Sequence, residues 1–279
     1  MGSGPLSAIA TWPVPNVSAA IVRFDGTVET AGDIDRPFLL ASITKLLTAW
    51  VALVAVEEGS IALDTPVGQP GCTLRHLLSH AGGYPFEGPA PIAPPERRRI
   101  YSNTGIELAA DAVASATDIA FAAYFAEALL DPLGMTATAL PSSPAHGAIS
   151  TVRDMIRFIG ELITPTLLDA STVAAATSTH FPELAGRVPG IGPFRPCPWG
   201  LGFEVHGAKQ PHWMGAANSA SAFGHFGGAG TMLWVDPAAR VALVALTDRP
   251  FDEWAADALQ LWPAISDAVV ADGSAARIS

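Results

Sequence analysis

Basic residues are scarce in this chain of 279 residues. Lys and Arg number 15 against 26 Asp and Glu, which gives a formal net charge of -11 at neutral pH. Nucleic acids and anionic membrane surfaces are bound through clustered positive charge. The one basic run, Arg97–Arg99, is short and stands alone. The composition therefore argues against nucleic acid or a membrane surface as the main partner.

Cysteine and long hydrophobic runs are also nearly absent. Cys72 and Cys197 are the only cysteines and neither belongs to a CxxC pair, so a disulfide scaffold, a redox motif or a zinc ribbon has no support. The longest apolar stretch, Leu46–Val56, falls short of the roughly 20 residues of a membrane span. No basic start followed by an apolar run opens the chain, so no signal peptide is visible. We expect a soluble, cytoplasmic protein.

Apolar residues make up 49% of the chain, which is long enough to bury a core as one large domain or two modest ones. Strand patterns occur at both ends, and helical patterns fill the middle and return at the C-terminus. The expected strands are Val17–Phe24, Thr27–Thr30, Gly200–His206, Ala222–Phe226, Thr231–Val235 and Val241–Thr247. The expected helices are Ser42–Glu58, Thr104–Thr117, Ala120–Leu130, Thr151–Leu162 and Asp252–Val270.

This order predicts an α+β fold, in which an antiparallel sheet built from both chain ends is flanked by helices and interrupted by a mostly helical insertion. We expect a discontinuous sheet domain, residues 1–64 and 197–279, and a helical domain, residues 65–196. The active site is expected between them. The proline-rich segment Tyr84–Pro95 must be irregular because it lacks many backbone donors. We expect this segment to form an entrance loop in which Tyr84 and Phe86 set specificity.

The first candidate for chemistry is Ser42-Ile43-Thr44-Lys45, at the start of the first long helix. Residues three apart share a helix face, so the Lys45 amine is expected beside the Ser42 hydroxyl. A serine needs a group that removes its proton, and burial lowers the pKa of a lysine enough to provide one. Helix N-termini also favour negative charge. Taken alone, the spacing fits an N-cap serine and a surface lysine better.

Two further patterns support this chemistry. Tyr101-Ser102-Asn103 precedes a second helix, and a tyrosine near a lysine ammonium loses its proton more easily and can act as acid and base. Asn103 can orient the lysine or hold a substrate carbonyl. The glycine-rich strand Gly224–Gly230 indicates close approach of a ligand, whose oxyanion would meet bare N–H groups. A loop tyrosine and a bulged strand with a core histidine are the ordinary structural alternatives.

Together the three patterns follow the order of the Ser-x-x-Lys, Ser-Asp-Asn and Lys-Thr-Gly set of serine β-lactamases and penicillin-binding proteins. The chain closely resembles the class C β-lactamase-like family of serine hydrolases, which includes family VIII esterases, D-aminopeptidases and DD-peptidases. Five further segments carry the resemblance over nearly the whole chain: Leu77–Gly83, Asp131–Met135, Gly147–Asp154, Trp199–Gly202 and Val235–Pro237.

The resemblance implies that Ser42 is the nucleophile, Lys45 its activator and Tyr101 the acid/base. It also implies that substrate is bound by Asn103, His225, Gly227 and Gly228, with the N–H groups of Ser42 and Gly228 forming the oxyanion hole. No cofactor is implied. The chain departs from the family in two respects. His225 replaces the lysine that helps β-lactamases hold the substrate carboxylate, which moves the expected substrates toward esters, and the chain is shorter than many members.

A metal site is the rival interpretation of His76 and His80, which are four residues apart as in zinc proteases. Leu77 stands where the glutamate of H-E-x-x-H would be, and the resemblance treats His80 as structural, so we expect no metal.

The predicted function is a serine hydrolase that forms an acyl-enzyme with small esters or amides. A β-lactamase or a D-amino-acid peptidase is the alternative enzyme. A penicillin-recognising binding protein that has lost turnover is the alternative from another class. The presence of the whole set Ser42, Lys45, Tyr101 and Asn103 favours the enzyme.

Overall fold

The computed structural model describes residues 4–275, and its centre is a six-stranded antiparallel sheet in the order β2-β1-β10-β9-β8-β7. The strands are β1 Val17–Arg23, β2 Val28–Ala31, β7 Glu204–Val205, β8 Phe223–Gly227, β9 Thr231–Asp236 and β10 Val241–Thr247. Strand β1 pairs with β10 along its whole length, from Val17 opposite Thr247 to Arg23 opposite Val241. The two chain ends therefore build the sheet, as predicted.

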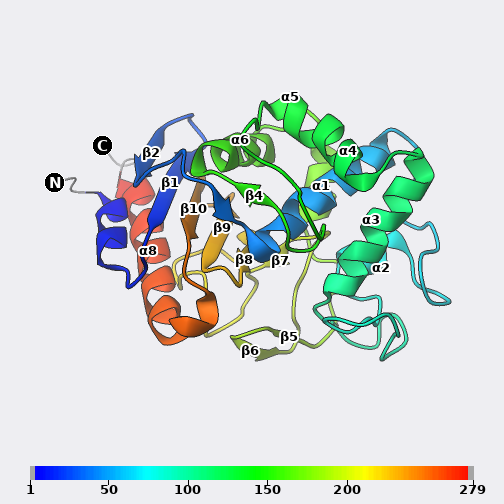
Figure 1. Ribbon diagram of the computed structural model, residues 1–279. Coiled ribbons are helices and arrows are strands. Elements are labelled where there is room, and N and C mark those ends of the chain that lie inside the picture. Colours follow the sequence, from blue (N-terminus) through cyan, green and yellow to red (C-terminus); the bar gives the residue numbers. More distant parts are fainter. Residues whose placement is uncertain (1–3, 276–279) are drawn as a thin grey trace.

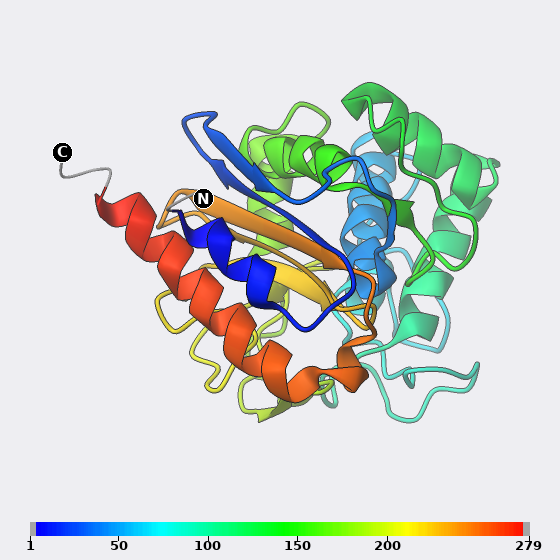
Figure 2. The ribbon, with the colours of Figure 1, turned by 60° about the vertical axis from the view of Figure 1, so that its left-hand side comes forward.

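Helices cover both faces of this sheet (Figure 2). Helix α8, Ala255–Ala275, and the 3₁₀ helix Pro5–Thr11 lie on one face, whereas α1, Thr44–Glu57, and α6, Val152–Ile163, lie on the other. Alternate residues of β1 and β10 enter the two hydrophobic clusters. Because both faces are buried, these strands are continuous apolar runs without polar alternation.

The segment between β2 and β7 contains most of the helices, joined by long irregular stretches, and lies on the side of the molecule away from α8 (Figure 1). Its elements are α2 Leu74–Leu78, α3 Asn103–Thr117, α4 Phe121–Phe125, α5 Asp131–Leu133 and α7 Ala170–Thr177, with short paired strands β3 Phe38–Leu39, β4 Ile149–Ser150, β5 Gly186–Val188 and β6 Gly192–Phe194. The division into two domains remains a prediction. The end residues of the expected sheet domain, 1–3 and 276–279, lie outside the described range.

Several predicted elements differ in extent. The expected helix Ala120–Leu130 is divided, because a π-helical turn over Ala126–Leu130 follows α4. The expected strand Gly200–His206 contains only β7. Both cysteines are buried and free. Within residues 4–275 no single helix is long and apolar enough to cross a membrane, although Asn103–Thr117 and Phe121–Leu133, bent by 89°, pass that test together by length and composition.

Candidate active site

Ser42 lies in a 3₁₀ turn, Ala41–Ile43, directly before α1. The preceding Ala41 has a φ of 47°, a left-handed conformation that is costly for a residue with a side chain. The sheet packs closely against this turn. Thr231 donates a 2.8 Å hydrogen bond to the Leu40 carbonyl, and a Cβ added at Gly227 would lie 2.4 Å from the same oxygen. The glycine at position 227 thus lets β8 approach the turn that carries Ser42.

Lys45 lies in the first turn of α1 and is completely buried. Its Nζ donates hydrogen bonds to Ser42 Oγ at 3.1 Å, to Asn103 Oδ1 at 2.6 Å and to the Ala145 carbonyl at 2.9 Å. Burial lowers the pKa of Lys45 to about 7. A substantial share of the amine is therefore unprotonated at neutral pH, and its lone pair can accept the Ser42 proton.

Tyr101 completes the group around Ser42, with its ring centroid 4.8 Å from Lys45 Nζ. Burial raises the pKa of Tyr101 above its ordinary value, although a hydrogen bond with the Ser42 hydroxyl acts in the opposite direction. The phenol is consequently protonated at neutral pH. This corrects the expectation that the neighbouring lysine would ease its ionisation, because burial outweighs the effect of its neighbours. In the resting protein Tyr101 can therefore donate a proton, and Lys45 is the neighbouring group that can accept one.

His225 is buried beside Tyr101, with ring centroids 5.6 Å apart. Its Nδ1 lies 2.5 Å from the Phe226 carbonyl oxygen, which can only accept, so Nδ1 carries the proton. Burial, reinforced by the Lys45 charge, lowers the pKa of His225 to about 3, and the ring is neutral. Its Nε2 therefore presents a lone pair and has no hydrogen-bond partner among the described residues.

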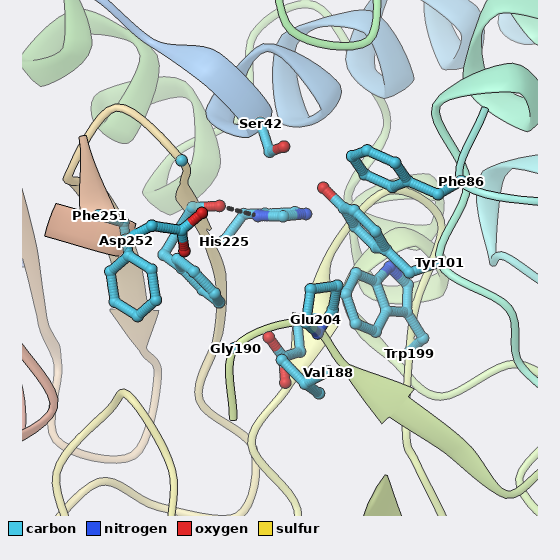
Figure 3. A pocket seen from close by; sticks show the side chains of 13 residues that line it. Ser42, Phe86, Tyr101, Val188, Gly190, Trp199, Glu204, His225, Phe251 and Asp252 are labelled. Atoms are coloured by element: carbon cyan, nitrogen blue, oxygen red, sulfur yellow. Dashed lines mark hydrogen bonds between the residues drawn. The ribbon is translucent and has the colours of Figure 1, made fainter. Parts of the chain in front are cut away.

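A pocket of about 190 Å³ opens above these residues, with Ser42, Tyr101, His225 and Gly228 in its lining. Figure 3 shows the hydroxyls of Ser42 and Tyr101 pointing into the same space, with the His225 ring beside them. The remaining lining is largely apolar: Phe86, Val188, Pro189, Gly190, Trp199, Phe226 and Phe251, with Glu204 and Asp252 as the acidic members. The structure thus brings together six of the seven predicted site residues: four line the pocket, and Lys45 and Asn103 join them through hydrogen bonds. The seventh, Gly227, packs behind the pocket against the turn that carries Ser42.

Glu204 was missed by the sequence analysis. This buried carboxylate on β7 accepts hydrogen bonds from Lys209 at 2.6 Å and His212 at 2.8 Å on Oε1, and from Trp213 at 2.8 Å on Oε2. Burial by itself raises the pKa of Glu204, but the Lys209 and His212 charges prevail and lower it. The carboxylate is therefore ionised. The only hint in the sequence is that Glu204, Lys209 and His212 lie within nine residues of one another.

The two histidines of the rival metal interpretation have separate surroundings. His76 contacts Thr73 and Glu96 through its two ring nitrogens. His80 is buried, packs with its centroid 4.7 Å from that of Tyr101, and accepts a hydrogen bond from the Ser102 N–H at 3.3 Å. Between residues 4 and 275, no three His, Cys, Asp or Glu residues are grouped so that they could hold a metal ion.

The two aromatic residues expected at the entrance also differ. Phe86 is 51% exposed, stacks on Tyr101 with centroids 5.9 Å apart and lines the pocket. Tyr84 is buried in the core instead, and its hydroxyl accepts a 2.6 Å hydrogen bond from the Gln69 N–H. The structure therefore supports an entrance role for Phe86, and the interpretation of Tyr84 was wrong.

Comparisons with known proteins point to one family. A family model described as Beta-lactamase matches residues 12–265. A solved structure described as a beta-lactamase from Mycobacterium bovis is 48% identical, covers 96% of this chain and 99% of its own, and superposes with a TM-score of 0.94. Simvastatin synthase from Aspergillus terreus shares the fold at 19% identity, with a TM-score of 0.76 over 95% of this chain and 96% of its own.

A curated relative matches over a shorter region. The D-alanyl-D-alanine-carboxypeptidase/endopeptidase AmpH of Escherichia coli strain K12 is 27% identical over 148 residues. The match covers 40% of this chain and 38% of that protein, so it spans well under half of the relative's length.

Proposed function

Because this chain belongs to the beta-lactamase family, we propose that it is a serine hydrolase that cleaves small acyl esters through a covalent acyl-enzyme on Ser42. The observation that carries the proposal is the 3.1 Å contact between Ser42 Oγ and a buried Lys45 whose pKa is about 7. A protein that only recognised its ligand would have no need to hold a partly neutral lysine against a serine.

The reaction begins when neutral Lys45 accepts the Ser42 proton and Ser42 Oγ attacks the substrate carbonyl. The oxyanion is held by the N–H groups of Ser42 and Gly228, both of which line the pocket. Tyr101 gives its proton to the leaving oxygen as the acyl–oxygen bond breaks, and it recovers a proton from Lys45. Water then attacks the acyl-enzyme, with the same groups acting in reverse, and releases the acid.

His225 favours esters over substrates that carry a carboxylate next to the scissile bond. A lysine at this position would offer a positive charge, whereas neutral His225 offers a lone pair on Nε2. A carboxylate also presents only lone pairs, so the two groups repel each other unless the ring is protonated. A small, largely apolar pocket suits a short acyl chain instead. β-Lactam hydrolysis remains the competing activity, because the Mycobacterium bovis relative is described as a beta-lactamase.

Intact-mass analysis after exposure to a fluorophosphonate, and separately to a penicillin, tests this proposal. The fluorophosphonate should add to Ser42 and not to Ser42→Ala. Ser60→Ala, which removes an exposed serine, is the matched control and should keep the label. Short acyl esters should be turned over by wild type, with little penicillin adduct. Labelling that persists in Ser42→Ala would overturn the mechanism, and efficient penicillin turnover with negligible esterolysis would establish the β-lactamase alternative.

A further inference from the structure

Two exposed arginines line a groove beside the pocket. Arg98 and Arg187 are exposed, and among residues 4–275 neither guanidinium has an ion pair or a hydrogen bond. Other exposed arginines do have a carboxylate partner, as Arg153 does in Asp35. Arg98 and Arg187 are thus free to meet a ligand.

A buried arginine fixes the direction in which these two side chains point. Arg99 pairs with Gly186 in a parallel bridge, and its N–H donates to the Ala185 carbonyl at 2.9 Å. Its guanidinium turns inward and donates to backbone carbonyls, including Cys197 at 2.6 Å. Side chains alternate along extended segments, so the neighbours Arg98 and Arg187 face outward. A Cβ at position 186 would lie 2.7 Å from Arg99 Cβ, which explains the glycine there.

Arg98 and Arg187 line a groove of about 540 Å³ that adjoins the pocket at Ser42. The groove and the pocket share Phe86, Tyr101 and Pro189 in their linings. No described residue in the lining of the groove is an aspartate or a glutamate. Arg99 also lines the groove, but its guanidinium is turned inward to backbone carbonyls. A ligand that passes Tyr101 therefore moves from a largely apolar pocket into a groove with two outward-facing guanidinium groups and no described carboxylate in its lining.

We infer that this groove receives the leaving group of the substrate, and that the leaving group carries an anion, a carboxylate or a phosphate, which Arg98 and Arg187 bind. The inference rests on the proposed function. Tyr101 gives its proton to the leaving oxygen, so the leaving group must lie against Tyr101, and the groove begins at that ring. Guanidinium groups bind carboxylates and phosphates through paired, charge-assisted hydrogen bonds.

The chemistry of the step is unchanged by this assignment. The bond between Ser42 Oγ and the acyl carbon forms, the acyl–oxygen bond breaks, and the leaving oxygen takes the Tyr101 proton. The product released first is an alcohol that carries the anion. An anion next to the scissile carbonyl would instead face the lone pair of His225, so the arginines select a charge that lies farther along the leaving group.

The test compares three butyrate esters that differ only at the far side of the leaving phenol: a meta carboxylate, its neutral methyl ester, and a meta phosphate. The measured quantity is the ratio of kcat/KM for each anionic ester to that for the neutral one. Wild type should prefer at least one anion by about fivefold or more, and the preference should shrink in high salt. Arg98→Ala/Arg187→Ala should bring the ratio to about one or below, and Arg187→Glu should invert it.

Arg195→Ala removes an exposed arginine that does not line this groove and is the matched control, so its ratio should stay at the wild-type value. Preference for one anion alone supports the inference and identifies the anion. If wild type hydrolyses all three esters equally, or if the double variant keeps the preference, the inference is wrong while the proposed function stands. If no ester is cleaved and Ser42 is not acylated, the proposed function fails, and the inference fails with it.

Discussion

Lys45 donates a 2.6 Å hydrogen bond to the side chain of Asn103, a residue 58 positions farther along the chain. The bond joins the first turn of α1, which packs on the sheet, to the first residue of α3 in the helical region. Lys45, which we propose as the base that activates Ser42, is therefore held by two parts of the fold at once. The charge state of Lys45 consequently depends on the group at position 103, which gives a direct way to probe it.

The first prediction concerns the pH dependence of ester hydrolysis. Lys45 must be neutral to accept the Ser42 proton, so kcat/KM should rise with pH through about 7, the pKa to which burial lowers this lysine. Asn103→Asp places a negative charge against Nζ, which favours the ammonium and should move this limb upward by about one pH unit or more. The measurement is the pH profile of kcat/KM for both proteins. An unchanged limb in Asn103→Asp would remove Lys45 as the titrating base.

The second prediction concerns the proton-transfer groups as a unit. Lys45→Ala and Tyr101→Phe should each lower kcat by about a hundredfold or more, the lower end for general acid–base catalysis. The double variant should lose much less than the product of the two effects, because the residues act in one sequence of proton transfers. Thermal unfolding of each variant is the control for folding. Near-normal turnover in Tyr101→Phe would exclude it from the mechanism.

The third prediction separates the entrance from the core. Phe86→Ala should change the relative rates of esters with different leaving groups, because Phe86 lines both the pocket and the groove. Tyr84→Phe should leave these rates unchanged and destabilise the protein by about 1–3 kcal/mol, since the Gln69 N–H loses its partner. Urea unfolding and ester competition assays measure both effects. The reverse pattern would contradict the placement of the two rings.

Local patterns were enough to predict the sheet but not its exact limits. Strand β10 was predicted with the correct limits because its first six residues, 241–246, are a continuous apolar run that ends at the polar Thr247. Alternate residues of this run enter the two hydrophobic clusters. Helix α7, Ala170–Thr177, was missed because Ala176 is its only buried residue, so it has no apolar face to recognise. Within the expected strand Gly200–His206, Gly202 lies outside the observed strand β7. A Cβ built at Gly202 would lie 2.3 Å from the Cβ of Ala49, so the glycine there serves close packing on α1.

The candidate site shows the same division between local and tertiary information. Ser42 and Lys45 were predicted as neighbours because three residues along a helix start determine their distance. The ionisation of Tyr101 was misjudged because it depends on burial by Trp199 and His225, which come from distant parts of the chain. Glu204 was not predicted as a site residue for a similar reason, since its role depends on tertiary contacts, such as that with Lys209, and not on a sequence motif.

The fourth prediction concerns the buried charge of Glu204. Glu204→Gln leaves Lys209 with an uncompensated charge in the interior, which should cost about 3–5 kcal/mol of unfolding free energy. The pKa of Glu204 is lower in the folded protein than its ordinary 4.5, so its contribution is present above 4.5 and is lost as the pH falls below that value. Urea unfolding of wild type and variant at several pH values measures the difference. Equal stability at neutral pH would contradict the ion pair.

The last prediction concerns His225 and distinguishes the esterase from the β-lactamase. Neutral His225 donates Nδ1–H to the Phe226 carbonyl and presents a lone pair on Nε2, so it cannot donate to the carboxylate of a penicillin. A lysine, with an ordinary pKa of about 10.4, would supply a positive charge there and a charge-assisted hydrogen bond roughly twice as strong as a neutral one. His225→Lys should therefore raise kcat/KM for nitrocefin relative to that for p-nitrophenyl butyrate. Because burial opposes the new charge, as it does for Lys45, the gain should be largest at acidic to neutral pH. If wild type hydrolyses nitrocefin efficiently and the ester barely, another group holds the carboxylate, and the chain is a β-lactamase in activity as well as in fold.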